Sequence, residues 1–253
     1  MSLTAIVREV SPSINECELS FHTRQPIDVG RAAAQHQIYR GILAELGLHL
    51  VALPAEPALP DAVFVEDPAV VLDELAVIAH MGAPSRRREA ESLAKVLARY
   101  RKLAFLKEPA TLDGGDVLRV ARTLFVGLSR RTNQAAIDQL AELLREHAYT
   151  VKGVAVRRCL HLKSACSYIG QRTMLINRSW IDARPFSEFE MLDVPEEEAA
   201  AGNALLLNDV VILPASFPRT RALLQKRGFR VRTVDLSELQ KAEAGVTCTS
   251  LIF

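Results

Sequence analysis

The sequence lacks the features that mark membrane proteins and nucleic-acid-binding proteins. No apolar run approaches the roughly 20 residues that a membrane span needs. Basic side chains number 31 and acidic ones 30, which leaves a net charge of +1. The chain therefore lacks the excess of positive charge that would attract a nucleic acid or an anionic membrane. The partner that this charge balance favours is a small molecule that is recognised locally.

Signals for secretion and for a disulfide framework are also missing. The N-terminus reaches Arg8 and Glu9 before a hydrophobic segment could form, so we expect no secretory signal. The only cysteines are Cys17, Cys159, Cys166 and Cys248. They form no CxxC pair and no metal-ligand spacing, so we interpret them as thiols in a reducing cytoplasm. The first three are expected to be inert packing residues.

What is present is an ordinary globular composition. Apolar residues make up 49% of the 253 and charged residues 24%, which argues against disorder and allows a sizeable core. No linker or low-complexity stretch interrupts the chain. We therefore predict one domain that spans residues 1–253.

Four segments have the hydrophobic spacing of amphipathic helices. They span residues 28–46, 84–100, 133–148 and 216–228. The first begins with an Asp and ends before Gly47, which are ordinary start and stop signals. Its apolar stripe is predicted to consist of Ile38, Ile42 and Leu46. Around residues 185–191 the sequence indicates only one ragged turn.

Between these helices lie pairs of strands joined by polar turns. The pairs fall within residues 63–80, 111–127, 160–176 and 203–215, and single strands are expected at 3–7 and 247–253. The polar residues that open these blocks are Glu66, Asp113, His161, Asn203 and Cys248. The intervals between them are 47, 48, 42 and 45 residues, which is the range of propellers, solenoids and arrays.

This regular spacing predicts the fold class. Five units of strand, strand and helix, closed into a ring, would bring the block starts to a common centre. The prediction is therefore an α/β propeller. The alternative is an ordinary α/β sandwich in which the spacing is accidental.

Cys248 and His161 are candidates for a nucleophile and its acid/base partner. Small residues surround Cys248 in GVTCTS and leave room for a ligand. A thiolate is a strong nucleophile when nearby cations lower its pKa. His161 holds the position in its unit that Cys248 holds in the last, and such pairs can be far apart in sequence yet adjacent in the fold. The alternatives are a half-buried packing cysteine and a hydrogen-bonded core histidine.

Two acidic motifs form the next candidate group. LPDAVFVEDP and TLDGGDV contain Asp61, Glu66, Asp67, Asp113 and Asp116. Glu66 is predicted to follow an alternating strand, so that Asp67 points to the opposite face or lies in the turn that the next proline sets. Several negative charges at one centre repel unless a cation fills it, and a planar guanidinium donates to more than one carboxylate. The alternative is turn chemistry, since Asp before Pro or Gly is a common turn former.

Two basic clusters lie at the start of two predicted helices. They are SRRRE at residues 85–89 and SRRTN at residues 129–133. Both are expected near the mouth of the ring. Cations there would suit the α-carboxylate of an amino-acid substrate. The alternative for each of these arginines is a solvated basic face.

Six motifs follow one another along the chain: LPDAVFVEDPAVV, GAPSRRRE, TLDGGDVL, VGLSRRTNQ, LHLKSACS and GVTC. In this order and spacing, from about Leu19 to Cys248, they resemble the dimethylarginine dimethylaminohydrolase family of the guanidino-group-modifying (pentein) superfamily. The resemblance implies a five-bladed, pseudo-symmetric α/β propeller of ββαβ units. It also implies hydrolysis of Nω,Nω-dimethyl-L-arginine, and of the monomethyl form, to L-citrulline and the amine through a covalent S-alkylthiouronium intermediate.

Residue by residue, the resemblance implies that Cys248 is the nucleophile, His161 the acid/base residue and Asp113 the carboxylate that partners the histidine. The family uses either Glu or Asp at the position of Asp113. The implied substrate contacts are Leu19, Asp61, Glu66, Asp67, Arg86, Arg131 and Ala242. Leu19 would belong to a lid loop, and Ala242 would bind through its backbone.

The resemblance implies no metal and no organic cofactor, although zinc could bind adventitiously at Cys248 as an inhibitor. Two rival functions stay open: an arginine deiminase-like hydrolase of unmodified arginine, and a non-catalytic sensor of arginine derivatives. The intact Cys248, His161 and Asp113 argue against the sensor. The short chain argues against the deiminase branch, whose members typically carry extra helical segments. The sequence does not indicate the oligomeric state.

Overall fold

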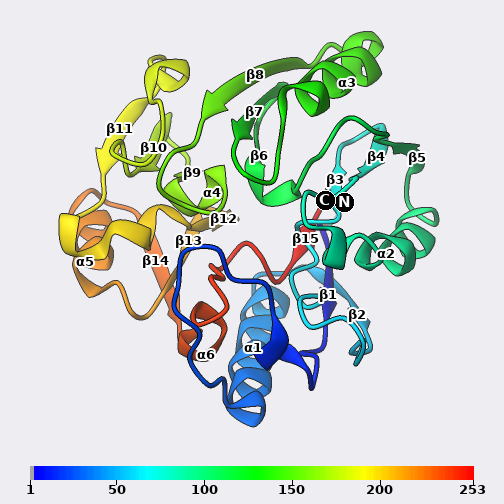
Figure 1. The fold of residues 1–253 in the computed structure, drawn as a ribbon. Helices are drawn as coiled ribbons and strands as arrows, with labels where there is room; N and C mark the ends of the chain where they lie inside the picture. Colours follow the sequence, from blue (N-terminus) through cyan, green and yellow to red (C-terminus); the bar gives the residue numbers. More distant parts are fainter. Residues whose placement is uncertain (1–2) are drawn as a thin grey trace.

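The computed structural model describes residues 3–253, and within them five small sheets are arranged in a ring (Figure 1). The strands are β1 (Thr4–Arg8), β2 (His49–Leu53), β3 (Ala69–Val71), β4 (Leu75–Ile78), β5 (Lys102–Phe105), β6 (Val117–Val120), β7 (Thr123–Leu128), β8 (Thr150–Ala155), β9 (Cys166–Tyr168), β10 (Thr173–Ile176), β11 (Glu190–Asp193), β12 (Leu205–Leu207), β13 (Val210–Pro214), β14 (Arg230–Val234) and β15 (Leu251–Ile252). The sheets are β15-β1-β2, β3-β4-β5, β6-β7-β8, β9-β10-β11 and β12-β13-β14. This arrangement confirms the predicted five-bladed propeller.

Helices and helical turns occupy most of the connections. The helices are α1 (Val29–Glu45), α2 (Glu89–Leu97), α3 (Gln134–Leu144), α4 (Leu162–Ala165), α5 (Pro218–Lys226) and α6 (Ser237–Gln240). The 3-10 turns are η1 (Ile14–Glu16), η2 (Pro84–Arg86), η3 (Gly114–Asp116), η4 (Arg145–His147), η5 (Arg184–Phe186) and η6 (Glu196–Gly202). No helix within residues 3–253 has the length and apolar character that crossing a membrane requires.

Each blade repeats one connection pattern. Its inner pair of strands is antiparallel, as in β3–β4, and its outer pair is parallel, as in β4–β5. A parallel pair needs a crossover, and α1, α2, α3 and α5 supply it on the outside of the ring in four blades (Figure 1). In the fourth blade, between β10 and β11, only η5 is present. The four predicted helices and the ragged turn near residue 185 are thus confirmed.

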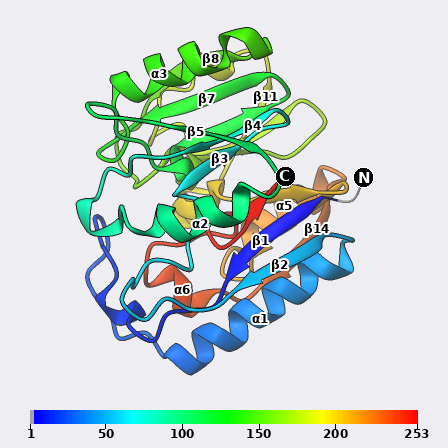
Figure 2. The same ribbon diagram turned by 90° about the vertical axis from the view of Figure 1, so that its right-hand side faces the viewer.

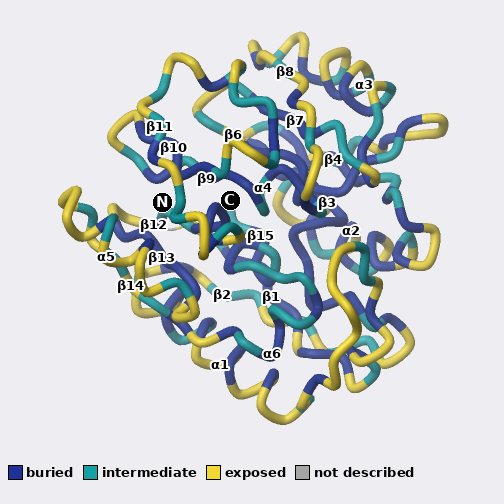
Figure 3. The backbone as a smooth tube through the Cα atoms, turned by 60° about the vertical axis from the view of Figure 1, so that its left-hand side comes forward, coloured by how far each residue is buried: buried dark blue, intermediate teal, exposed yellow. Residues whose placement is uncertain are grey.

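The middle strand of each blade carries the core. β4, β10 and β13 are buried along their whole length, whereas the outer strands β2 and β5 alternate between partly buried and exposed residues. Figure 3 shows the same gradient, with buried backbone toward the middle of the molecule and exposed loops at the rim. Strands covered on both faces are expected to be continuous apolar runs.

The predicted apolar stripe of the first helix is wrong at one position. Ile38 is 59% exposed, whereas Gln35 and His36 are buried. The Gln35 side chain donates to Ser237 Oγ at 2.9 Å, which allows a polar residue on the buried face. Because two polar residues occupy that face, hydrophobic spacing alone misplaced its centre. Asp28 does cap the helix, accepting the Arg31 N–H at 3.0 Å.

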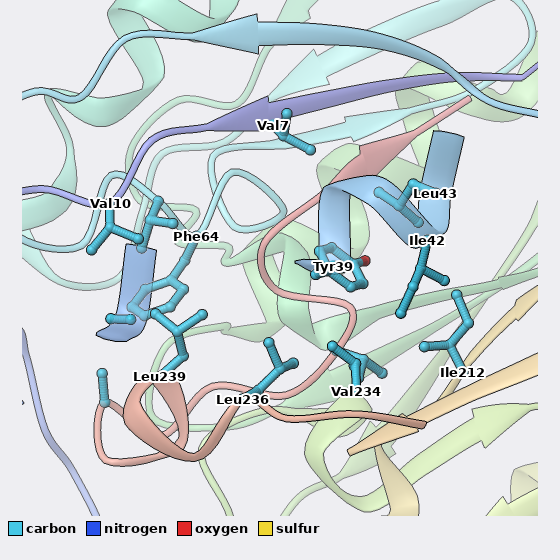
Figure 4. Packing of buried hydrophobic residues seen from close by; sticks show 14 of the residues in the cluster. Val7, Val10, Tyr39, Ile42, Leu43, Phe64, Ile212, Val234, Leu236 and Leu239 are labelled. Atoms are coloured by element: carbon cyan, nitrogen blue, oxygen red, sulfur yellow. The ribbon is translucent and has the colours of Figure 1, made fainter. Parts of the chain in front are cut away.

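The last strand closes the ring on the first. β15 pairs antiparallel with β1, with Ala5 opposite Ile252, so the two ends of the chain share one sheet. Only Leu251–Ile252 of the predicted strand 247–253 is extended, since the residues before it form a turn. Figure 2 shows α1 lying along β1 and β2 in this blade. Figure 4 shows its core, where Val7 and Tyr39 gather with Leu239 from α6.

The residues that open the blocks lie in turns, bends or irregular segments ahead of the strands. Residues 63–65 were predicted as a strand that leads to Glu66, but they form successive buried turns, with the Asp67 N–H donating to the Phe64 carbonyl at 3.2 Å. His161 likewise precedes the short helix α4, and strand structure begins only at Cys166. Residues outside the strands are not bound by the strand hydrogen-bond ladder, so these polar side chains can converge on the ring centre.

Candidate active site

One pocket at the ring centre gathers most of the predicted catalytic and binding residues. Its walls include Cys248, His161, Asp67, Arg86 and Arg131. They come from five different connections, each just before the first strand or the crossover of a blade. Asp61, Phe64 and Ala242 line the same pocket. The predicted common centre therefore exists, and it holds a thiol, an imidazole, carboxylates and guanidinium groups together.

His161 is held between two carboxylates. Its Nε2 lies 3.2 Å from Asp113 Oδ2, and its Nδ1 lies 3.8 Å from Asp67 Oδ1. Burial disfavours the imidazolium, but the charge of Asp67 and the hydrogen bond to Asp113 outweigh it and raise the pKa of His161 to about 9. The side chain is therefore a proton donor at neutral pH. The predicted pairing of His161 with Asp113 is present in this geometry.

Asp67 also pairs with groups other than His161. Its Oδ2 accepts from Arg86 Nη1 at 2.8 Å, and its Oδ1 accepts the Gly115 N–H at 3.1 Å. Burial opposes ionisation, yet His161 and Arg86 keep the pKa of Asp67 below its usual value. A Cβ at residue 115 would lie 2.4 Å from His161 Nδ1, so only glycine allows this approach.

Cys248 lies in the turn before β15. Its Sγ accepts the Gly245 N–H at 3.3 Å, and its carbonyl accepts the Glu66 N–H at 3.3 Å. Burial, with the negative charges of Glu66 and Asp67, raises the pKa of the Cys248 thiol to about 12. The resting side chain is therefore a thiol, and a cation placed beside it is needed to favour the thiolate.

Glu66 does not point into this pocket. Its carboxylate accepts from Lys163 Nζ at 2.5 Å and from Thr247 Oγ1 at 2.7 Å. These three side chains line a separate cavity of about 320 Å³, between the inner strands of the blades. Glu66 and Asp67 thus serve opposite sides, as predicted for neighbouring residues. Glu66 is not among the residues that line the catalytic pocket, and its substrate contact stays a prediction.

The two predicted arginines are the buried ones of their clusters. Arg86 donates to Asp67 and, through Nε and Nη2, to Glu89 at 2.9 and 2.8 Å. Arg131 Nη1 lies 3.7 Å from Asp113 Oδ2, and its Nη2 donates to Ser20 Oγ at 3.4 Å. Their neighbours in the two clusters, Arg88 and Arg130, are exposed. A solvated basic face describes those neighbours but not the two pocket residues.

Asp61, from the connection between β2 and β3, is hydrogen-bonded to the N-terminal loop next to Leu19. The Asp61 carboxylate accepts the Glu18 N–H at 3.1 Å, and burial raises its pKa. Leu19 is partly buried against the hydrophobic cluster that includes Phe64. Ala242 is 5% exposed and lines the pocket directly. The loop that carries Leu19 therefore lies next to the pocket, as a lid would.

Two buried acids were not assigned roles from the sequence. Asp116 accepts from Ser129 Oγ at 2.6 Å, Thr132 Oγ1 at 2.7 Å and the Leu162 N–H at 2.8 Å, which orients the turn of His161. Burial raises the pKa of Asp116 to about 6 and that of Glu89, the second partner of Arg86, to about 7. Their sequence signal was weak, because a single acid near a glycine pair or in a first helical turn is common.

The side chains of Asp67, Asp113 and His161 are close enough to share a metal ion, with ligand atoms within 4.8 Å of one another. Arg86 already donates to Asp67, so a cation at this point would compete with a guanidinium. This cluster does not include Cys248, and inhibitory zinc at that thiol stays a prediction.

Comparison with known proteins gives a consistent result. A family model described as arginine deiminase matches residues 49–212. The N(G),N(G)-dimethylarginine dimethylaminohydrolase of Pseudomonas aeruginosa is 34% identical over 98% of this chain and 98% of its own length. The enzyme of that name from Streptomyces coelicolor is 36% identical over 99% of this chain and 96% of its own.

A solved structure has the same fold. It is a dimethylarginine dimethylaminohydrolase from Pseudomonas aeruginosa, a cysteine-to-serine mutant complexed with citrulline, 32% identical with a TM-score of 0.94 over the whole of both chains. The level of identity, its extent over both chains and the shared ring of blades all agree with the six sequence motifs. This chain belongs to the dimethylarginine dimethylaminohydrolase family.

Proposed function

We propose that this protein hydrolyses Nω,Nω-dimethyl-L-arginine, and the monomethyl form, to L-citrulline and the corresponding amine. The observation that carries the proposal is the convergence of Cys248, protonated His161 and a set of carboxylates in one pocket of a chain from this family. The citrulline complex of the related Pseudomonas aeruginosa enzyme supports the same product.

Substrate binding would prepare the nucleophile. The guanidinium brings a positive charge close to a thiol whose pKa is raised by burial and by the negative charges of Glu66 and Asp67. That charge lowers the cost of forming a thiolate, so the substrate itself activates the enzyme. Holding the guanidinium carbon within attack distance of Sγ lowers the barrier further, by several kcal/mol through orientation alone.

The first half of the reaction forms a covalent intermediate. The Cys248 thiol gives its proton to solvent when the substrate is bound, and the thiolate adds to the guanidinium carbon. An S–C bond forms as the carbon becomes tetrahedral and the C=N π electrons move onto nitrogen. His161 gives its proton to the methylated nitrogen, the C–N bond breaks, and neutral dimethylamine leaves. An S-alkylthiouronium group then remains on Cys248. Such proton transfer contributes roughly 10²–10⁴-fold in rate.

The second half returns the free enzyme. His161, now neutral, accepts a proton from a water molecule as that water attacks the thiouronium carbon. The hydroxyl of the resulting tetrahedral adduct loses its proton as the C–S bond breaks and citrulline is released. Cys248 takes up that proton and regains its thiol form. Asp113 stabilises the imidazolium at both stages, because its Oδ2 lies at hydrogen-bond distance from Nε2.

Selectivity would depend on how the guanidinium is oriented. The methylated nitrogen has no hydrogen to donate, so it would turn away from the carboxylates and toward an apolar wall such as Phe64, which lines the pocket. Each missing methyl changes the free energy by only about 1–3 kcal/mol. Unmodified arginine has no such constraint and could bind with its central carbon displaced from Cys248. We therefore expect it to be a poor substrate.

The deciding experiment incubates the purified protein separately with dimethylarginine, monomethylarginine and arginine, and quantifies citrulline together with the released amine. We expect dimethylamine and methylamine from the first two, and little ammonia from arginine. If kcat/KM for arginine equals or exceeds that for dimethylarginine, the arginine deiminase function replaces this one. Absence of turnover with all three would favour the non-catalytic sensor.

A further inference from the structure

Asn203 opens one of the five blocks, and neither the fold nor the proposed reaction has given it a role. The residue is 5% exposed, and its amide joins two other blocks of the ring. Nδ2 donates to the Lys163 carbonyl at 2.9 Å and to Thr247 Oγ1 at 3.0 Å, and Oδ1 accepts the Thr247 N–H at 3.2 Å. Lys163 lies two residues after His161, and Thr247 lies directly before Cys248. One amide therefore links the segment of the acid/base residue to that of the nucleophile.

The backbone on both sides of Asn203 is fixed to the blade β9-β10-β11. Ser167 Oγ, in β9, donates to the Gly202 carbonyl at 2.8 Å and accepts the Ala204 N–H at 2.9 Å. Because the backbone is held on both sides, binding of the amide to a neighbouring turn costs little further conformational entropy. The amide thus extends from a fixed base to the turn of Cys248.

The turn that carries Cys248 packs closely against this amide. A Cβ at residue 245 would lie 2.2 Å from Asn203 Oδ1 and 2.3 Å from its Cγ, so only glycine allows the contact. The Gly245 N–H in turn donates to Cys248 Sγ at 3.3 Å. Gly245 therefore touches both the amide and the reactive sulfur. A displaced amide would change the position of the N–H group that Sγ accepts.

The amide also closes a cycle of hydrogen bonds that joins the entries of four blades. Thr247 Oγ1 donates to Glu66 Oε2 at 2.7 Å, and Glu66 Oε1 accepts from Lys163 Nζ. The Lys163 carbonyl accepts from Asn203, which completes the cycle. Hydrogen bonds in a buried network strengthen one another. Loss of the amide would open the cycle and separate Thr247, the neighbour of Cys248, from α4.

We propose that Asn203 is a positioning residue, which holds the Cys248 turn at a fixed place relative to His161. This inference rests on the proposed function, because it concerns the alignment of the nucleophile and the acid/base residue of that reaction. Asn203 is not among the residues that line the catalytic pocket, so it acts through Thr247 and Gly245 and not on the substrate. A misplacement of about 1 Å can lower a rate by a hundredfold. A purely structural role would instead lower stability and leave kcat unchanged.

Two pairs of full-length variants separate these roles. Asn203→Ala removes the amide, and Asn177→Ala is its matched control. Asn177 also donates to a backbone carbonyl, that of Ala199 at 2.9 Å, and accepts the Ser179 N–H at 3.1 Å, but it lies outside the catalytic pocket. In the second pair, Thr247→Val removes the hydroxyl that belongs to the cycle, whereas Thr247→Ser keeps it. Thermal unfolding shows which variants are folded at the assay temperature.

The first measurement is steady-state hydrolysis of dimethylarginine. We expect Asn203→Ala to lower kcat about tenfold to a hundredfold and to change KM less than about twofold. Thr247→Val should also lower kcat, while Thr247→Ser and Asn177→Ala keep the wild-type value. The proposal is overturned by an unchanged kcat in folded Asn203→Ala, by an equal loss in Asn177→Ala, or by a rise in KM that accounts for the whole effect. If Asn203→Ala does not fold, equal kcat values in Thr247→Val and Thr247→Ser overturn it.

The second measurement follows the thiol without any substrate. Cys248 is partly exposed and the other three cysteines are buried, so iodoacetamide should alkylate it selectively. Burial is the largest cause of its raised pKa, and a turn that Asn203 no longer holds would expose the sulfur. Asn203→Ala should therefore react about threefold to tenfold faster at pH 8, while Asn177→Ala matches wild type. An unchanged alkylation rate would contradict the proposal. Failure of wild type to release dimethylamine would refute only the proposed function, because alkylation needs no substrate.

Discussion

The catalytic pocket and the separate cavity beside it are both lined by buried charges, yet their charges are organised differently. In the cavity, Glu66 is matched by Lys163 and Thr247. In the pocket, Asp67 is shared between Arg86 and His161, and the Cys248 thiol is held protonated. Arg131 Nη1 lies 3.7 Å from Asp113 and makes no hydrogen bond within residues 3–253. Charges that are paired with one another stabilise a fold, whereas charges that are not fully paired within the protein can bind a charged ligand.

The difference is sharpest at two adjacent residues. Glu66 and Asp67 are neighbours in the chain, and their side chains differ by one methylene. The turn that contains both residues directs their carboxylates to different cavities. The same acidic motif therefore has one carboxylate on the wall of the separate cavity and one on the wall of the catalytic pocket. Four experiments would test this difference between the pocket and the cavity.

The largest effect is expected at the nucleophile. Cys248→Ser should lower citrulline formation by many powers of ten, because the hydroxyl is far less acidic and less nucleophilic than the thiol. Cys166→Ala is the control, since Cys166 is fully buried in a hydrophobic cluster outside the pocket and its thiol donates to the Leu162 carbonyl. It should retain most of the turnover. More than about a tenth of wild-type activity in Cys248→Ser would refute the assignment.

The next effect separates the two adjacent acids. Asp67→Asn removes the charge that contributes most to keeping His161 protonated, so kcat should fall by roughly 10²–10⁴-fold. Glu66→Gln should instead leave Lys163 buried beside a neutral group, which costs about 3–5 kcal/mol of stability when a buried pair is broken. Thermal unfolding and steady-state kinetics measured on both variants test the contrast. A raised KM without a lowered Tm in Glu66→Gln would favour the predicted substrate contact.

A smaller effect is expected at the amino-acid end of the pocket. Arg86→Gln and Arg131→Gln should raise KM about tenfold to a hundredfold and change kcat less, since the α-carboxylate is remote from the reacting carbon. Arg88→Gln and Arg130→Gln are matched controls, because these neighbours are exposed. Unchanged KM in both pocket variants would contradict the orientation proposed for the substrate.

The smallest effect concerns stability against pH. His161 has its pKa raised from 6.5 to about 9, so folding favours the protonated form. Its contribution is fully present below pH 6.5 and is lost as pH rises through about 9. The free energy of unfolding of wild type should therefore fall by on the order of 1–3 kcal/mol over this pH window, relative to that of His161→Gln. Urea unfolding at pH 6 and pH 9.5 measures the difference, and parallel pH dependences of the two proteins would count against it.

Much of the architecture could be predicted from the order of residues. The recurrence of block starts every 42 to 48 residues indicated five blades. The crossover helix α1 begins after its predicted start signal, Asp28, and α3 begins at the predicted start of its segment, next to Asn133. Local signals succeeded there because a cap or an amphipathic stripe depends on residues a few positions apart. That the chain forms one domain, and that it works in the cytoplasm, stays a prediction.

The candidate site could be predicted in part for the same reason. A cysteine among small residues, a histidine at the matching block start and acids before Pro or Gly are visible in the sequence. Which way each side chain points is not visible. Residues 63–65 alternate like a strand but form turns, and this difference decides that Asp67 and not Glu66 lines the pocket.

The sequence by itself determined the number of blades, the positions of the helices and the identity of the reactive groups, since these follow from periodicity and residue chemistry. Only the tertiary structure decided how the charges are shared. The raised pKa of His161, the pairing of Arg86 with Asp67 and the contacts of Asn203 with Thr247 each depend on groups from distant segments. Electrostatic coupling acts through space, so it becomes defined only when the ring closes.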